Sequence, residues 1–228
     1  ASDVYKRQSL LRVVTYHAFV CSSRWNQMFI ILLRLLKFQS FAFICPSLCE
    51  VMAGRACIAI TGTPGTGKTA LCQSLGAGYP VLSLKDLAEQ YQCLGPQDTA
   101  DGAAPIDIHQ LAEKWQFQDN EITFIDGHLS HFLDVDAIVV LRCNPLELEK
   151  RLQSRDYSTA KIAANVEWEL ISGTWSELLE FEISVPLLEL DTSSTSTEEL
   201  QTQVLSWIEK KFPSQSLKES SSQAIDWM

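Results

Sequence analysis

The sequence predicts an α/β fold in which a five-stranded parallel sheet carries helices on both faces. Three observations support this prediction. Five short apolar runs alternate with helical patterns along the chain, as in parallel sheets joined by crossover helices. The first run leads into a glycine-rich turn, Gly62–Thr69, and a helix follows that turn. The third run ends at Asp126, which the carboxyl end of a parallel strand would bring beside the turn.

The glycine-rich turn fits G-x-x-x-x-G-K-[ST], the pattern of a phosphate-binding loop, between a predicted strand at 56–61 and a helix at 70–75. N–H groups at the start of such a helix surround an anion, and glycines let phosphate oxygens approach the backbone. Lys68 would reach the β- and γ-phosphates, and the Thr69 hydroxyl would hold Mg²⁺. We expect six loop residues to bind the phosphates of a nucleoside triphosphate: Gly65, Thr66, Gly67, Lys68, Thr69 and Ala70.

The second and third strands are predicted at 79–84 and 121–126. Between them the pattern indicates a helix at 85–91, a loop rich in Gly, Pro and Asp at 94–105, and a helix at 108–115.

Asp126 and two histidines stand at the end of the third strand. A carboxylate in this position beside a phosphate-binding loop holds Mg²⁺ directly or through water; the alternative is a turn or helix-capping residue. A neutral His128 near the γ-phosphate would orient or deprotonate an attacking water, while a structural histidine bonded to a loop carbonyl fits the spacing equally well. We interpret His131 as structural.

The second half of the chain supplies the remaining elements. They are strands at 137–142 and 185–190 and helices at 146–155, 160–171 and 198–212. The tail, 214–228, is rich in Ser and Gln, which favours disorder, although Ile225–Met228 offers a small apolar docking element.

Three cations bracket the bend between the helices at 146–155 and 160–171: Arg151, Arg155 and Lys161. Phosphoryl transfer needs cations near the transferring group, and a helical lid delivers them. We therefore expect Arg151 and Arg155 to contact the nucleotide, with surface charges of no special role as the alternative. Together with Lys68, Asp126 and His128, Arg155 completes the set of expected catalytic residues.

The first 51 residues differ from the rest. Residues 28–44 are apolar, but Arg34, Lys37 and Gln39 interrupt them. A charge at mid-membrane costs a few kcal/mol, so a membrane span fits poorly, as does a signal peptide with so late an apolar run. We expect residues 1–51 to be a non-native or disordered extension, with an anchor or presequence as the alternative.

The net charge of −10 is unevenly distributed. Residues 1–51 hold six basic and two acidic residues, whereas residues 52–228 hold 12 basic and 26 acidic ones. An acidic body disfavours direct DNA binding, which depends on Lys and Arg, and suits a basic protein partner. The seven cysteines show no metal-type spacing and favour reduced, buried thiols in the cytosol.

Three motifs carry a resemblance to a known family. They are the loop at 62–69, Asp126-Gly127-His128, and the run from Arg151 to Glu169, which reads Arg-Leu-x-x-Arg-x-Tyr-Ser-x-x-Lys-Ile-x-x-Asn-Val-x-x-Glu. Together they resemble the small adenylate-kinase-like family, which includes archaeal adenylate-kinase-like proteins and the eukaryotic coilin-interacting nuclear ATPase. The resemblance covers about residues 55–212, and the last two motifs are more specific than the loop.

The resemblance implies a P-loop nucleoside monophosphate kinase fold over residues 52–213, with a monophosphate-binding region at 83–115 and a lid at 151–165. It implies phosphate transfer from MgATP to AMP, or to another monophosphate, and ATP hydrolysis. It also implies a role in late maturation of the small ribosomal subunit, through a basic small-subunit ribosomal protein. The expected location is the cytoplasm, and also the nucleus in a eukaryotic source.

Two positions depart from the family pattern. Family members usually have Gly where this chain has Asp156, and an acidic residue beside Arg155 would weaken the grip of the lid on ATP. Members also commonly have Arg where this chain has Glu89, so the phosphate of AMP would lose one partner. Both departures leave a second hypothesis open, an assembly-factor ATPase in which water replaces AMP.

Overall fold

A computed structural model describes residues 54–96, 104–155 and 157–227, so the expectation for residues 1–51 lies outside the described residues. Its five strands form one sheet in the order β2-β3-β1-β4-β5, and every pair of neighbours is parallel. The strands are β1 (Ala56–Thr61), β2 (Val81–Ser83), β3 (Ile122–Asp126), β4 (Ala137–Arg142) and β5 (Leu187–Asp191). The predicted five-stranded parallel sheet is confirmed.

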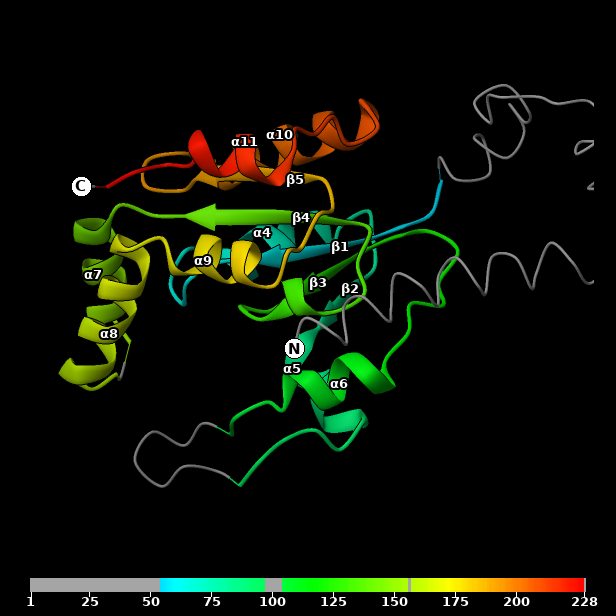
Figure 1. The fold of residues 1–228 in the computed structure, drawn as a ribbon. Coiled ribbons are helices and arrows are strands. Elements are labelled where there is room, and N and C mark those ends of the chain that lie inside the picture. The colour runs from blue at the N-terminus through cyan, green and yellow to red at the C-terminus, as the bar shows by residue number, and fades with distance from the viewer. Residues whose placement is uncertain (1–53, 97–103, 156, 228) are drawn as a thin grey trace, which may run out of the picture. The chain divides into compact units, whose positions relative to one another are not determined.

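Helices connect the strands and cover both faces of the sheet (Figure 1). They are α4 (Lys68–Leu75), α5 (Leu84–Gln90), α6 (Ile108–Lys114), the 3-10 helix η3 (Ser130–Phe132), α7 (Pro145–Gln153), α8 (Thr159–Leu170), α9 (Gly173–Glu180), α10 (Thr197–Glu209) and α11 (Leu217–Ser222). None of the helices in the described ranges has both the length and the hydropathy that crossing a membrane requires.

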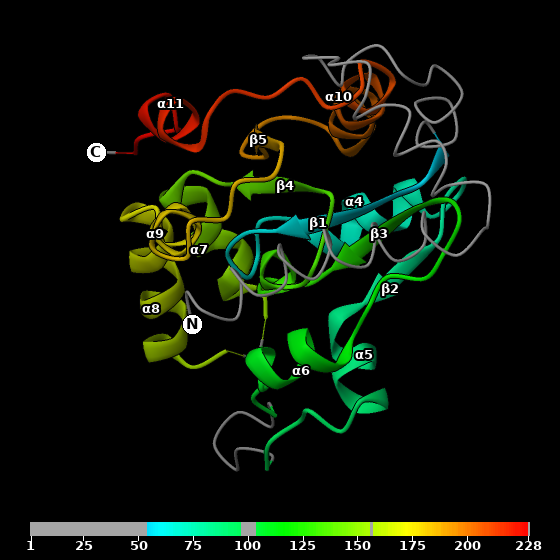
Figure 2. The same ribbon diagram turned by 45° about the vertical axis from the view of Figure 1, so that its right-hand side comes forward.

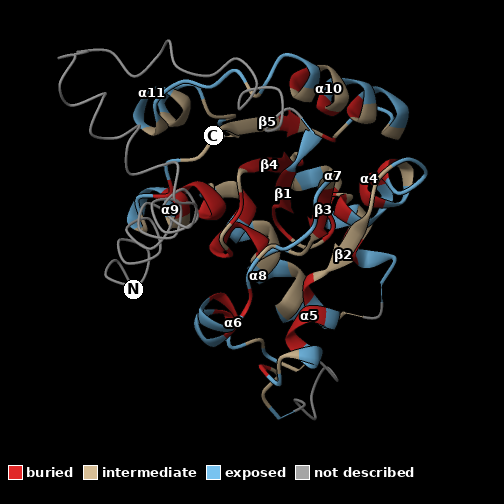
Figure 3. Cartoon of the chain, turned by 90° about the vertical axis from the view of Figure 1, so that its right-hand side faces the viewer, coloured by how far each residue is buried: buried red, intermediate tan, exposed pale blue. Residues whose placement is uncertain are grey.

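The central strands form the core, because β1 and β4 are buried along their whole length (Figure 3). Ile58 and Ile60 of β1 pack with Leu71 of α4 and with Leu200 and Val204 of α10 on one face. On the opposite face lies α9, in front of the sheet in Figure 1 where α4 lies behind it. Burial on both faces explains why these strands read as continuous apolar runs.

The carboxyl ends of the inner strands meet at one edge of the sheet. Ile60 pairs with Asp126, and Ser83 pairs with Asp126 from the other side. The helix pairs α7–α8 and α5–α6 extend from this same edge (Figure 2). The fold therefore brings the loop after β1, the end of β3 and both peripheral helix pairs to one place.

Two parts of the described chain differ from expectation. The helix α9 is not predicted by the sequence pattern. It begins at Gly173, where a Cβ would lie 2.1 Å from the Trp168 ring, so glycine lets that ring pack over the helix start.

The tail expected to be disordered instead forms α11, and Ile225 and Trp227 bond to residues far away in the chain. The alternative, that this segment docks on the rest of the protein, is therefore the better description. Its hydrogen bonds to distant residues hold the segment in place although its composition is polar.

The loop after β1 approaches the backbone of β4 so closely that only glycine fits. Gly62 has φ of 131°, and a Cβ there would lie 2.2 Å from the carbonyl oxygen of Leu141. Because this contact is with backbone atoms and the φ is positive, no rotation of a neighbouring side chain would make room for a Cβ at Gly62.

We predict that Gly62→Ala lowers the free energy of unfolding by about 2 kcal/mol or more, because β1 and β4 must separate to admit the methyl group. Gly78→Ala is the matched control, since a Cβ on Gly78 meets nothing within 4 Å. Denaturant unfolding of both variants without nucleotide measures the difference. Equal stability of the two variants would contradict this account of the loop.

Candidate functional site

The glycine-rich loop between β1 and α4 is open to an approaching group at one point. Gly65 and Gly67 have φ of 99° and 95°, and a Cβ on Gly67 would meet nothing within 4 Å. Gly67 is the N-cap of α4, and no side chain bonds to the helix start there. Open backbone beside an uncapped helix N-terminus fits an anion such as a phosphate group.

Lys68 supplies a buried positive charge inside this loop. Its Nζ donates to the carbonyl oxygens of Gly62 at 2.7 Å and Thr63 at 2.9 Å. Burial lowers the pKa of Lys68 to about 8; Asp126 opposes that shift, and the Arg155 cation adds to it. An incoming anion would favour the charged ammonium form.

Thr69 and Asp126 meet across the site. The Thr69 hydroxyl donates to Oδ2 of Asp126 at 2.8 Å. The alternative capping role for Asp126 finds no support, because the nearest helix, η3, has Leu129 as its N-cap. A hydroxyl and a carboxylate oxygen, one on each side of the phosphate loop, are the ligand types that Mg²⁺ uses in P-loop proteins, so the residues present fit the metal.

The two histidines after β3 have different environments. His128 is exposed at the surface, yet desolvation by the surrounding protein and the charge of Lys68 lower its pKa to about 4. The lowered pKa makes His128 neutral at pH 7. His131 is buried, with Nδ1 2.8 Å from the Thr61 hydroxyl and Nε2 3.3 Å from Glu177, as a structural histidine would be.

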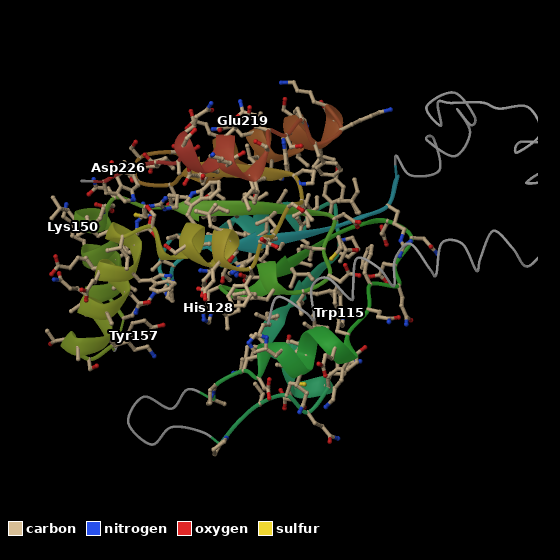
Figure 4. All side chains as sticks on the ribbon, viewed as in Figure 1. Trp115, His128, Lys150, Tyr157, Glu219 and Asp226 are labelled. Carbon is tan, nitrogen blue, oxygen red and sulfur yellow. The ribbon has the colours of Figure 1, made fainter. Side chains whose placement is uncertain are left out.

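The two lid arginines lie in different places. Arg155 is exposed, and its positive charge contributes to the lowered pKa of Lys68. Arg151 instead ties α7 to the segment after β5, because its Nη2 donates to the carbonyl oxygen of Thr192 at 2.7 Å. Lys161 lies with Nζ 4.5 Å from the centre of the Tyr157 ring. Tyr157 is found at the α7–α8 bend (Figure 4).

The structure therefore brings together Lys68, Thr69 and Asp126 at the open end of the loop. The charge of Arg155 contributes to the lowered pKa of Lys68, and the charge of Lys68 contributes to the lowered pKa of His128. It does not bring Arg151 to the loop in this conformation. The catalytic and ligand-binding roles of these side chains stay predictions.

Glu169 contacts the phosphate loop, although the sequence pattern predicts no such role for it. Glu169 of α8 is buried and accepts a hydrogen bond from the hydroxyl of Thr63 in the phosphate loop. It also pairs with Arg142, whose Nε lies 2.7 Å from Oε1. The available signal was the Glu at the end of the α8 motif, but nothing in the sequence indicates that it points toward the loop.

Comparisons with known proteins find related sequences. A protein family described as an AAA domain matches residues 58–172. A protein of Archaeoglobus fulgidus named "Putative adenylate kinase" is 40% identical over 144 residues, which are 63% of this chain and 76% of that protein. A protein of Pyrococcus abyssi with the same name is 38% identical over 156 residues, 66% of this chain and 83% of its own.

Solved structures are more distant. A gluconokinase from Sinorhizobium meliloti 1021 matches 74% of this chain and 97% of its own length at 15% identity, with a TM-score of 0.45. The identity and coverage of the archaeal relatives carry the conclusion, and on that basis the chain belongs to the adenylate-kinase-like family of P-loop proteins.

Proposed function

We propose that the chain is a nucleoside monophosphate kinase of the adenylate kinase type, which converts ATP and AMP into two ADP and also hydrolyses ATP. The observation that carries the proposal is the meeting of Lys68, Thr69 and Asp126 at an uncapped helix N-terminus. Family membership supports a phosphotransferase that acts on nucleotides. Neither AMP specificity nor ATP hydrolysis follows from family membership alone.

In the proposed reaction an oxygen of the AMP phosphate attacks the γ-phosphorus of ATP, and the bridging oxygen leaves with ADP. Mg²⁺, when bound, neutralises phosphate charge. Lys68 and Arg155 offset the charge that spreads over the transferring group. Thr69 and Asp126 would hold the metal, and the N–H groups at the start of α4 would orient the phosphates.

The second substrate would bind between the strand ends and the pair α5–α6. Gly127 lets the segment after β3 pack closely against α5, because a Cβ there would lie 2.4 Å from Cβ of Leu84 at the start of α5. Glu89 is exposed on α5, where family members commonly have Arg, so AMP phosphate would bind with one cation fewer. We therefore expect weak binding of the monophosphate.

An assembly-factor ATPase is the second candidate. In it water, oriented by a neutral His128, replaces AMP as the nucleophile, and turnover switches a protein complex. Glu89 and the low pKa of His128 favour it. We propose a basic small-subunit ribosomal protein as the partner, as the family resemblance implies, and a cytoplasmic or nuclear location. The excess of acidic residues in 52–228, 26 against 12 basic ones, is compatible with any basic protein partner.

One assay separates the two candidates. We predict that the full chain with MgATP forms ADP faster when AMP is present, because the kinase reaction yields two ADP for each ATP consumed. Coupled detection of ADP, repeated with each nucleoside monophosphate, measures the effect. A rate of ADP formation that is the same with and without each monophosphate would reject the kinase and favour the ATPase.

The lid assignment has its own test. We predict that Arg155→Ala lowers turnover by about tenfold or more, because it removes a cation from the transition state. Lys218→Ala in α11 is the control, an exposed cation on a surface helix. Steady-state rates of the two variants give the comparison, and equal rates would remove Arg155 from the site.

Lys68 predicts a pH dependence of ATP binding. The pKa of Lys68 is lowered to about 8 in the free protein, so above pH 8 the side chain is neutral and must take up a proton when the triphosphate binds. The affinity should therefore fall as pH rises above 8, by at most about tenfold per pH unit. Calorimetry in buffers of different ionisation enthalpy measures the proton uptake. Adenosine, which lacks phosphate, is the control, and an affinity for ATP that stays constant from pH 7 to 9.5 would contradict the assignment.

A further inference from the structure

A buried polar network lies behind the phosphate loop, where β4, β5, α8 and α9 meet the end of the chain. Its centre is Arg142, at the end of β4, whose side chain is 1% exposed. The guanidinium contacts two carboxylates, Glu169 with Nε at 2.7 Å and Glu189 with Nη1 at 2.9 Å. One cation thus faces two anions, so further donors are needed to satisfy the carboxylate oxygens.

Glu169 is the member of this network that reaches the phosphate loop. It is the buried residue of α8 and stands near the C-terminal end of that helix, where the helix dipole disfavours a negative charge. Its Oε1 accepts from Arg142 and from the N–H of Cys143 at 3.1 Å, and its Oε2 accepts from the Thr63 hydroxyl. Removing such a donor leaves a buried charge poorly satisfied.

Thr63 in turn determines where Lys68 lies. The carbonyl oxygen of Thr63 accepts from Nζ of Lys68 at 2.9 Å, from the hydroxyl of Thr66 at 2.9 Å and from its N–H at 3.2 Å. A shift of the Thr63 side chain would therefore move the carbonyl that holds the buried ammonium group. Glu169 is thus connected to Lys68 through Thr63, whose hydroxyl bonds to Glu169 and whose carbonyl oxygen bonds to Lys68.

The end of the chain supplies further donors to the two carboxylates. The indole Nε1 of Trp227 donates to Oε1 of Glu169 at 3.1 Å, and the N–H of Ile225 donates to Oε2 of Glu189 at 2.9 Å. The carbonyl oxygen of Ile225 accepts from Arg142 at 3.2 Å, and the guanidinium lies 5.8 Å from the centre of the Trp227 ring. The chain end, with Asp226 labelled in Figure 4, thus returns to the side of the molecule where β4 ends (Figures 1 and 4).

We propose that the C-terminal segment 225–227 is a positioning element of the nucleotide site. By bonding to Glu169 it fixes the carboxylate that holds Thr63, and through Thr63 it sets the loop that grips the phosphates of ATP. Trp227 and Glu169 are positioning residues, because they act through the loop and do not touch the nucleotide. This inference rests on the proposed function, since it concerns the binding of ATP.

The test compares two tryptophan variants of the full chain. Trp227→Phe keeps an aromatic ring and removes the N–H that bonds to Glu169. Trp207→Phe is the matched control, because its Nε1 also donates one hydrogen bond, to the carbonyl oxygen of Pro213 at 3.0 Å, but on α10 and away from the network. Calorimetry with ATP, with and without Mg²⁺, measures the dissociation constant, and thermal unfolding measures stability.

We expect Trp227→Phe to weaken ATP binding roughly three- to tenfold, and to raise KM for ATP while KM for the monophosphate stays constant. We expect Trp207→Phe to leave ATP affinity unchanged even if its Tm falls. A Trp227→Phe protein that loses Tm but binds ATP as the wild type does would overturn the proposal. If that variant fails to fold, a chain ending at Ala224 replaces it, and wild-type affinity in that chain would have the same consequence. Wild-type protein that does not bind ATP would instead reject the proposed function.

Discussion

The burial of a positive charge at the carboxyl ends of parallel strands is the interaction on which this molecule depends. An ammonium group taken out of water loses several kcal/mol of hydration unless oxygens replace that water. Lys68 finds its oxygens in two carbonyls of its own loop, and the loop turns back over it through the positive φ of its glycines. The compensation is incomplete, since the pKa stays lowered. That remaining cost is what makes a phosphate group a favourable partner.

The same loop is held from outside by α7 and α8. A Cβ on Gly65 would lie 2.8 Å from Leu148 and 2.9 Å from Leu152, so the loop packs directly on α7. From α8, Glu169 bonds to Thr63. Because both helices contact the loop, their position and the surroundings of the buried Lys68 are physically linked through packed atoms and hydrogen bonds.

Charge acts on two length scales in this protein. Residues 52–228 are strongly acidic, and their summed field repels a nucleotide at long range, although salt screens it beyond about 10 Å. Within the loop, contacts to Lys68 and to backbone N–H groups act at short range in a region that excludes water, where electrostatic interactions are much stronger. Attraction of an anion by the buried Lys68 at short range is therefore compatible with an acidic surface.

Much of the fold and the first half of the site could be predicted from local pattern. The apolar runs, the glycine loop and Asp126 each depend on neighbouring residues, so the sequence alone indicates the parallel sheet and the pairing of a loop with a strand-end carboxylate. The bounds shifted by only a few residues, as with β2, predicted at 79–84 and found at Val81–Ser83. Helix ends and short edge strands depend on tertiary contacts, which is why these bounds moved.

The tertiary structure alone decided what joins the site together. The partners of Arg142 come from β5, α8, α9 and the tail, up to 83 residues away along the chain. A polar tail looks disordered until the buried carboxylates to which it bonds are known, and nothing in the sequence indicates that Arg151 bonds to Thr192. Local patterns report the periodicity and the turns of a segment. Which buried charge meets which donor depends on how segments distant in the sequence pack, and only the folded chain determines that.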